Sequence, residues 1–165
     1  MTADVLTIDN LHVSYRGVKA VEDLSISVPA GTMTCIVGPN GSGKTTVLNM
    51  LSGVLDPAGG DVRLDEQPVA GLSADRLARR GMLRMFQLTR VFDRMPAFDN
   101  LLTSGLALGM DERAATARAI ALAEELQLEH VMHLDAGQLS GGQRKLLEFG
   151  ACFMREPRVA LLDEP

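Results

Sequence analysis

The sequence predicts an α/β protein with an antiparallel β subdomain, a core built on a parallel sheet, and an α-helical lobe. Three observations lead to this fold class. Short apolar segments with alternating side chains follow one another over residues 4–37. A glycine-rich loop at 38–46 stands between an apolar run and a helical pattern. A second apolar run, at 159–162, ends in Asp163 and Glu164, as expected for a strand of a covered parallel sheet.

The N-terminal subdomain is expected to contain strands at 5–8, 11–15 and 24–28, with turns at Gly17 and at 29–31. Tyr15, the only tyrosine, ends the second of these strands. Its ring offers the flat face that stacks on a purine, and it is equally typical of a half-buried strand residue. The residues alone leave both interpretations open.

The glycine-rich loop fits the pattern G-x-x-x-x-G-K-[S/T] at every fixed position. Residues 34–37 before it are expected to form a buried strand, and residues 47–51 after it a helix. Glycines let the backbone turn around a phosphate with its N–H groups inward, and the helix N-terminus adds partial positive charge. A chance glycine turn is the alternative, but it explains neither flanking element. The predicted phosphate-binding residues are Gly38, Pro39, Asn40, Gly41, Ser42, Gly43, Lys44, Thr45 and Thr46.

Within this loop, Lys44 is expected to reach the β- and γ-phosphates, and the Thr45 hydroxyl to ligate Mg²⁺. Further along, Gly53 suits a helix C-terminus, residues 61–64 a short strand, and Ser73 the start of a helix reaching Arg80. A strand at 82–86 then ends at Gln87. A glutamine at the carboxyl end of a strand can contact the ligand crevice of an α/β sheet, although a surface glutamine is the simpler interpretation.

Residues 88–138 are expected to form the helical lobe. One helix is predicted at 97–108, and another runs from an Asp111 cap to Leu126 with Ala114, Ala117, Ala121 and Leu122 on one face. His130 and His133 have a spacing that suits a metal, but no third ligand is near, so surface or packed histidines are favoured.

Along the whole chain we expect three segments: a β subdomain and nucleotide-binding core at 1–87, the lobe at 88–138, and a return to the core at 139–165.

The segment Leu139-Ser140-Gly141-Gly142-Gln143 precedes a helix that is expected to reach about Arg155. Ser140 and Gln143 form a capping-box pattern. A capping box does not need two glycines, and Gly141 and Gly142 leave the first turn open to a phosphate, which favours an anion site. At the end of the last strand, Asp163 is expected to hold Mg²⁺ and Glu164 to polarise an attacking water.

The composition narrows the class of protein further. The 165 residues carry a net charge of −5, which gives no electrostatic reason to expect nucleic acid as the main partner. No apolar run approaches the ~18 residues that cross a bilayer, and the N-terminus lacks the form of a signal peptide, so a cytosolic chain is expected. Cys35 and Cys152 lack metal-ligand spacing and are expected to be buried, reduced thiols.

Taken together, these motifs resemble the nucleotide-binding subunit of an ABC transporter, a phosphate-loop NTPase with a RecA-like core. The resemblance rests on the loop at 38–46, Gln87, the segment 139–143 and Leu161-Leu162-Asp163-Glu164-Pro165. It implies ATP and Mg²⁺ as ligands, Tyr15 as the adenine-stacking residue, and Gln87 as a sensor of Mg²⁺ and water. Ser140, Gly141 and Gly142, with Gln143, would bind the γ-phosphate of a nucleotide held by a second subunit. Residues 86–92, 99–102 and 143–148 are similar to importer ATPases for branched-chain amino acids, amides or urea.

The resemblance implies a head-to-tail dimer that drives membrane permease subunits from the inner face of the membrane. The family pattern continues past Glu164 with a dimer-contacting loop and a histidine, so the core is expected to be incomplete and the 165-residue chain inactive in hydrolysis. Two alternatives stay open: a soluble ATPase of this type that acts on DNA or ribosomes, and a nucleotide-binding fragment without turnover.

Overall fold

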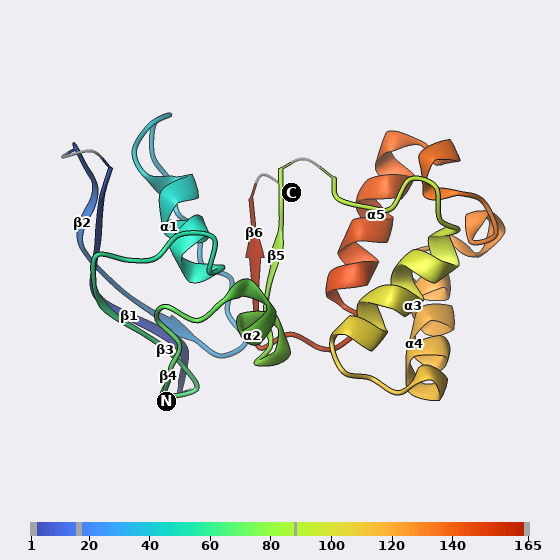
Figure 1. The fold of residues 1–165 in the computed structure, drawn as a ribbon, viewed down its shortest axis with the longest axis horizontal. Coiled ribbons are helices and arrows are strands. Elements are labelled where there is room, and N and C mark those ends of the chain that lie inside the picture. Colours follow the sequence, from blue (N-terminus) through green and yellow to red (C-terminus); the bar gives the residue numbers. More distant parts are fainter. Residues whose placement is uncertain (1–2, 16–17, 88, 164–165) are drawn as a thin grey trace. The chain divides into compact units, whose positions relative to one another are not determined.

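The computed structural model describes residues 3–15, 18–87 and 89–163. The chain divides into two compact units, Met1–Met82 and Leu83–Pro165 (Figure 1). Among the described residues, no helix combines the length and the apolar character required to cross a membrane.

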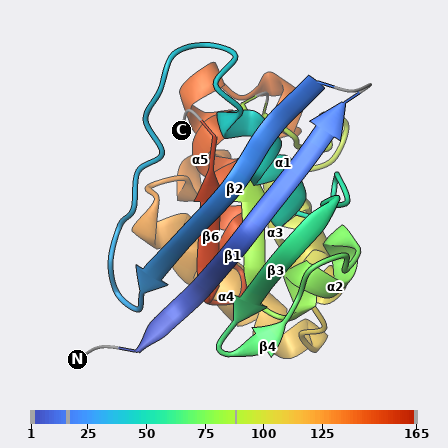
Figure 2. The same ribbon diagram turned by 90° about the vertical axis from the view of Figure 1, so that its left-hand side faces the viewer.

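The first unit is built on a four-stranded sheet with the order β2-β1-β3-β4 (Figure 2). β1 (Asp4–Tyr15) pairs antiparallel with β2 (Val18–Pro29) and with β3 (Gly59–Leu64), while β4 (Gln67–Pro68) extends the edge. The expected antiparallel subdomain is confirmed. The strands expected at 5–8 and 11–15 form one strand, because a register shift at Asn10, with φ 49°, lets the chain continue without a turn.

Two helices complete the first unit. α1 (Lys44–Leu51) lies behind the sheet in Figure 2 and buries Val47, Met50 and Leu51. It ends at Leu51 and is capped by Ser52, and Gly53 follows with a φ of 68°, the left-handed conformation expected after a helix. α2 (Ala74–Arg79) begins after Ser73, as the sequence predicts.

The strand expected at 34–37 is absent from the structure. Residues 32–39 have no regular secondary structure, Val37 is 90% exposed, and Cys35 is exposed rather than buried. The β-branched residues at 34–37 are typical of a strand, but a strand forms only when its backbone groups pair with those of a neighbouring strand. The described strands do not pair with this segment, so the phosphate loop follows a stretch of chain without regular secondary structure.

The second unit contains the helical lobe. β5 (Met82–Met85) and β6 (Val159–Leu162) form a two-stranded sheet and run in the same direction (Figure 1). α3 (Ala97–Ala107) packs against both α4 (Glu112–Glu125) and α5 (Gly141–Cys152). Two 3₁₀ turns, η1 (Glu129–Val131) and η2 (Ala136–Gln138), connect α4 to α5. The buried side chains at the centre are Leu101, Leu122, Leu128, Leu147 and Met154.

The expected helices are present, with two corrections. The buried face of α4 consists of Ala115, Ala119, Leu122 and Ala123, so of the predicted face residues only Leu122 is buried. Alanines occur on several sides of this helix, and their pattern does not fix which side faces the core. α5 ends at Cys152, three residues before the expected Arg155, and Phe153 caps it.

Candidate functional site

In the phosphate loop, the side chain of Lys44, which is expected to bind the phosphates, is hydrogen-bonded to the loop backbone. Lys44 Nζ donates hydrogen bonds to the carbonyl oxygens of Gly38, at 2.7 Å, and Pro39, at 2.8 Å. The Ser42 N–H donates to the Pro39 oxygen at 3.2 Å. The ammonium group therefore lies inside the loop that it would share with an anion.

The entrance to α1 explains why a glycine precedes Lys44. Gly43 has φ 91°, and a Cβ atom there would lie 2.6 Å from the Ala20 carbonyl oxygen, so both its conformation and its surroundings require glycine. The helix has neither a side-chain cap at Gly43 nor an acidic residue in its first turn. The first N–H groups of a helix have no partner within it. A loop cation and an uncapped helix start fit a phosphate group.

Asp163, the expected Mg²⁺ ligand, is paired with a cation in the structure. Arg84 Nη2 lies 2.8 Å from Asp163 Oδ2, with the two side chains 5% and 16% exposed. The Arg84 guanidinium also lies over the Phe86 ring, 4.6 Å from its centre. Arg84 thus balances the Asp163 charge inside the second unit.

The donor atoms suit Mg²⁺ even though no cluster of three His, Cys, Asp or Glu occurs in the part of the chain that the structure describes. Thr45, Gln87 and Asp163 offer hydroxyl, amide and carboxylate oxygens, and Mg²⁺ prefers oxygen ligands that leave room for water and phosphate. Thr45 belongs to the first unit and the other two residues to the second, so their shared role as Mg²⁺ ligands stays a prediction.

Gln87 is exposed, and both of its sides are fastened to α5. Lys145 Nζ donates to the Phe86 carbonyl oxygen at 3.0 Å. The Arg90 N–H donates to Glu148 Oε1 at 3.2 Å. These contacts join the residues on either side of Gln87 to α5, the helix that begins at Gly141 and Gly142.

The capping box at the start of α5 is confirmed. Ser140 Oγ accepts from the Gln143 N–H at 3.3 Å, and Gln143 Oε1 accepts from the Ser140 N–H at 2.9 Å. A Cβ atom built on Gly141 or Gly142 would meet nothing within 4 Å. Internal packing therefore does not require these glycines, and an anion role for them stays a prediction.

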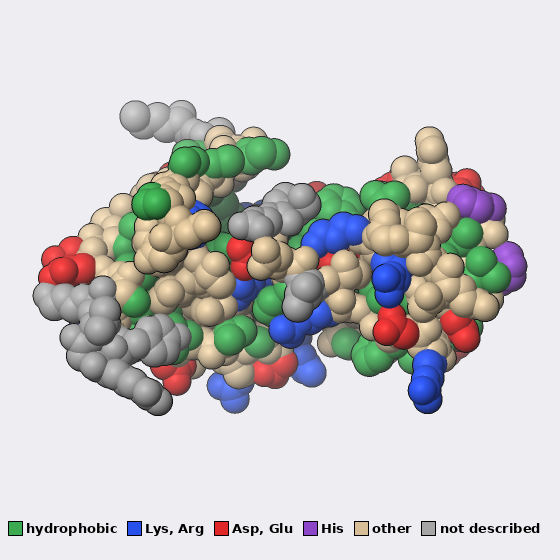
Figure 3. Space-filling view, turned by 90° about the horizontal axis from the view of Figure 1, so that it is seen from above, with side chains coloured by type: hydrophobic (Ala, Val, Ile, Leu, Met, Phe, Trp, Pro, Cys, Tyr) green, Lys and Arg blue, Asp and Glu red, His purple; other side chains and the backbone are tan. Residues whose placement is uncertain are grey.

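The remaining predicted residues differ in how far the structure describes them. The side chain of Tyr15 and the whole of Glu164 lie outside the described residues. His130 and His133 are exposed, and histidine side chains appear in purple on the surface in Figure 3. Cys152 is partly buried, and that burial, with the nearby Glu148 charge, raises the pKa of its thiol to about 11.

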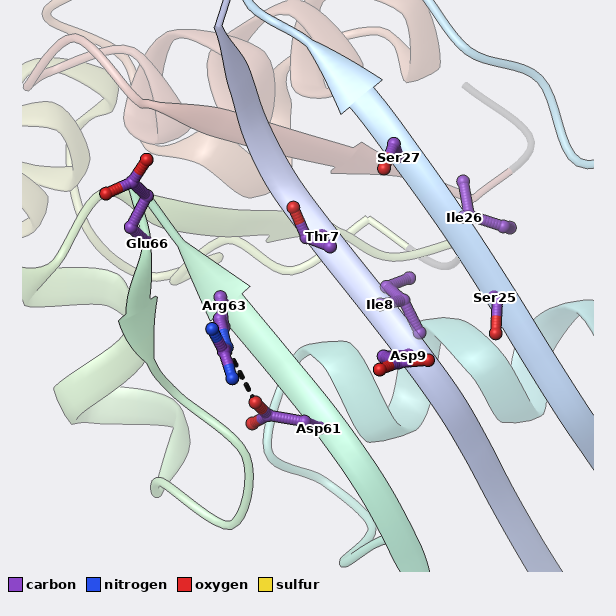
Figure 4. Close-up of a pocket in the computed structure, with 9 residues that line it drawn as sticks. All are labelled: Thr7, Ile8, Asp9, Ser25, Ile26, Ser27, Asp61, Arg63 and Glu66. Atoms are coloured by element: carbon purple, nitrogen blue, oxygen red, sulfur yellow. Dashed lines mark hydrogen bonds and ion pairs between the residues drawn. The ribbon is translucent and has the colours of Figure 1, made fainter.

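A hollow of about 660 Å³ lies away from the phosphate loop, on the outer face of the antiparallel sheet (Figure 4). Polar side chains of β1, β2 and β3 line it, and its Arg63 is paired with Asp61 at 2.7 Å. No residue of the phosphate loop contributes to it. We therefore do not assign the hollow to nucleotide binding.

The sequence analysis did not predict a role for Arg84, Lys145 or Glu148, although each has a feature in the sequence that could have indicated one. Arg84 is a charged residue in the middle of an apolar strand. Lys145 and Glu148 are opposite charges at i, i+3 in the helix that follows the Gly-Gly segment. Glu148 is 4% exposed, and a buried charge requires a partner.

Known proteins share both the sequence and the fold. A family described as ABC transporter matches residues 21–165. The branched-chain amino acid transport ATP-binding protein BraF of Pseudomonas aeruginosa is 36% identical and covers 100% of this chain, which spans 71% of that protein. LivG of Escherichia coli, with the same type of name, is 31% identical, with the same coverage of both chains.

Solved structures agree with these sequence relatives. A nucleotide-free ATP-binding cassette from an ABC transporter superposes with a TM-score of 0.87 at 30% identity, covering 99% of this chain and 70% of that one. The ADP conformation of another ATP-binding cassette of an ABC transporter gives a TM-score of 0.86 at 31% identity, covering 96% of this chain and 68% of that one. The fold and the match along most of the chain lead to one conclusion: the chain belongs to the ABC transporter family, as an ATP-binding domain of the ATPase type.

Proposed function

We propose that this chain binds Mg·ATP, and that the protein to which it belongs powers the import of branched-chain amino acids as the ATP-binding subunit of a transporter. The observation that carries the substrate class is the 36% identity to BraF over the whole chain. The loop that holds the Lys44 ammonium beside an uncapped helix start supports nucleotide binding. Amides and urea are the other substrates that the sequence resemblance suggests.

Each predicted residue has a role in this proposal. Residues 38–46 hold the phosphates, Tyr15 stacks on the adenine, and Thr45, Gln87 and Asp163 hold Mg²⁺, which when bound neutralises phosphate charge. Glu164 polarises the attacking water. In the full-length subunit, replacing Glu164 by Gln should lower turnover by roughly 10²–10⁴ with little change in binding, since the shape is kept and the base is lost.

The proposal includes a head-to-tail pair of ATP-binding subunits. The segment 139–143 then faces the nucleotide of the partner, so that a two-fold pair contains two equivalent sites. Permease subunits bind this pair at the inner face of the membrane. The division into a core at 1–87, a lobe at 88–138 and a return at 139–165 belongs to the same proposal.

Purification of the tagged chain from its own cells tests the transport role. We expect integral membrane permease subunits to copurify, at a level that rises with branched-chain amino acid import activity. Copurification with ribosomes or DNA-bound proteins alone would contradict the transport role and favour the soluble alternative. Measuring ATP binding and hydrolysis side by side separates an ATPase from a binding fragment without turnover.

A further inference from the structure

Gln87 lies between Phe86, next to the end of β5, and Arg90, and the backbones of both of these residues are hydrogen-bonded to side chains of α5. The Phe86 carbonyl oxygen accepts from Lys145 Nζ at 3.0 Å, and the Arg90 N–H donates to Glu148 Oε1 at 3.2 Å. Lys145 Nζ and Glu148 Oε2 lie 3.4 Å apart. These contacts form a chain from one side of Gln87 to the other through two side chains of a single helix.

The ion pair between Lys145 and Glu148 is more buried than an ordinary salt bridge on the protein surface. The Glu148 and Lys145 side chains are 6% and 27% exposed. A carboxylate taken out of water is tolerated when it is paired and hydrogen-bonded, and here one oxygen receives a backbone N–H while the other faces the ammonium. The pair is thus fixed in position, and so are the backbone groups bonded to it.

The Phe86 ring adds a second restraint on the same segment. The Arg90 guanidinium lies 3.7 Å from the ring centre and that of Arg84 lies 4.6 Å from it. Cations over an aromatic face attract its electron density, most strongly when shielded from water. Phe86 is therefore held through its ring as well as through its carbonyl group.

We infer that Lys145 and Glu148 are positioning residues for Gln87, and that they link the movement of this segment to α5. This inference rests on the proposed role of Gln87 at the nucleotide. α5 begins at Gly141, one residue after Ser140, so the helix that holds the Gln87 segment also carries the predicted contact with the partner's nucleotide. A change at Gln87 is passed to Ser140 and Gly141 through a rigid helix.

A charge swap distinguishes this role from simple stabilisation by an ion pair. In the double variant Lys145→Glu/Glu148→Lys the two opposite charges remain on one helix face, but residue 145 can no longer donate to the Phe86 oxygen. Residue 148 can no longer accept from the Arg90 N–H. Glu148→Gln keeps the acceptor oxygen, and Lys145→Arg keeps the donor, so these two serve as matched conservative variants.

Amide hydrogen exchange of the 165-residue chain without nucleotide provides the readout. We expect the swap and Glu148→Ala to reduce Arg90 N–H protection about tenfold or more relative to global stability, since a hydrogen bond to a charged group is lost. Glu148→Gln and Lys145→Arg should retain most of the protection. Wild-type protection of Arg90 in the swap would overturn the inference.

A second measurement follows the backbone signals of Gln87 and Gly141 by NMR while Mg·ATP is added. In the wild-type chain both signals should shift together, whereas in the swap only Gln87 should shift. Equal shifts at Gly141 in both proteins would also overturn the inference. An absence of any ATP-dependent shift would count against the proposed function instead, and the exchange data would still decide whether the two side chains hold the segment.

Discussion

Arg84 and Asp163 show how a single contact links the fold to the site. The aspartate expected to hold Mg²⁺ is already bonded to a guanidinium that is 5% exposed, so its charge is balanced without a metal. A metal that approaches Asp163 must therefore share the carboxylate with Arg84. The same contact holds β5 beside β6 in the second unit.

Replacing Arg84 by Gln should lower the free energy of unfolding by about 3 kcal/mol, because it leaves the Asp163 carboxylate without its cation in a poorly hydrated place. That figure is at the lower end for a broken buried pair, since Asp163 keeps some contact with water. Urea unfolding without nucleotide measures the change. The double variant Arg84→Gln/Asp163→Asn should lose clearly less than the sum of the single variants. Additive losses would show that the two side chains do not interact.

Cys152 and Cys35 should differ in reactivity. Burial, with the Glu148 charge, raises the pKa of the Cys152 thiol to about 11 from an ordinary value of 9.0, whereas Cys35 is exposed. The thiolate is the reactive form, so at about pH 8 a thiol reagent should modify Cys35 first. The single variants Cys35→Ser and Cys152→Ser assign the two rates, and faster labelling of Cys152 would contradict the structure.

The same raised pKa has a consequence for stability. The folded state favours the neutral Cys152 thiol, so this contribution is complete below about pH 9 and is lost as the pH rises toward 11. Cys152→Ser should show a smaller decline in stability across this interval than the wild-type chain.

At the scale of elements, side chains at the starts of α4 and α5 cap these helices, and one of the two caps is also predicted to contact a nucleotide. Asp111 Oδ1 accepts from the Ala114 N–H at 2.8 Å at the start of α4, and Ser140 does the equivalent at the start of α5. Only the second of these caps belongs to a predicted nucleotide contact. The pair therefore offers a matched comparison.

Asp111→Ala and Ser140→Ala should each lower the free energy of unfolding by about 1 kcal/mol, the usual cost of a lost helix cap. Only Ser140→Ala should also weaken ATP-dependent pairing of subunits, as measured by sedimentation with Mg·ATP. If both variants weaken pairing equally, the effect of Ser140 is one of stability alone.

Asn100 fixes the entry to α3. Its buried side chain accepts from the Phe92 N–H at 2.8 Å and donates to the carbonyl oxygens of Phe92, Met95 and Pro96. Asn100→Leu should cost at least about 1–3 kcal/mol in thermal or urea unfolding, because backbone groups lose their partners without access to water. Asn100→Asp keeps the acceptor oxygen, so its stability should lie between those of the wild type and Asn100→Leu. An unchanged stability in Asn100→Leu would show that water replaces the amide.

At the scale of the whole molecule, the sequence predicted the elements that local chemistry determines. The α1 start at a glycine loop, the α2 start after Ser73, the side-chain caps at Asp111 and Ser140, and the left-handed Gly53 all depend on neighbouring residues, and the structure has each of them. The antiparallel pairing of β1 and β2 follows from the alternation of their side chains, whereas the turn expected at Gly17 lies outside the described residues.

Features that depend on distant partners were harder to predict. The segment 34–37 has the composition of a strand, yet pairing decides whether a strand forms. The contacts Arg84–Asp163 and Lys145–Phe86 join residues 79 and 59 positions apart, and no local pattern encodes such pairs. The sequence thus predicted Asp163 and Gln87 as site residues, but not that Arg84 contacts Asp163 or that Lys145 contacts the residue before Gln87.

The central claim is that residues 38–46 bind the phosphates of ATP through Lys44. Calorimetric titration of the chain with Mg·ATP, compared with Lys44→Ala, tests it most directly. Arg63→Ala is the matched control, because it removes one positive charge from the same unit outside the loop. We expect Lys44→Ala to bind ATP about ten- to a hundredfold more weakly, from a lost charge-assisted contact, and Arg63→Ala to bind as the wild type does. Equal affinity in a folded Lys44→Ala protein would contradict the assignment of this loop as the nucleotide site.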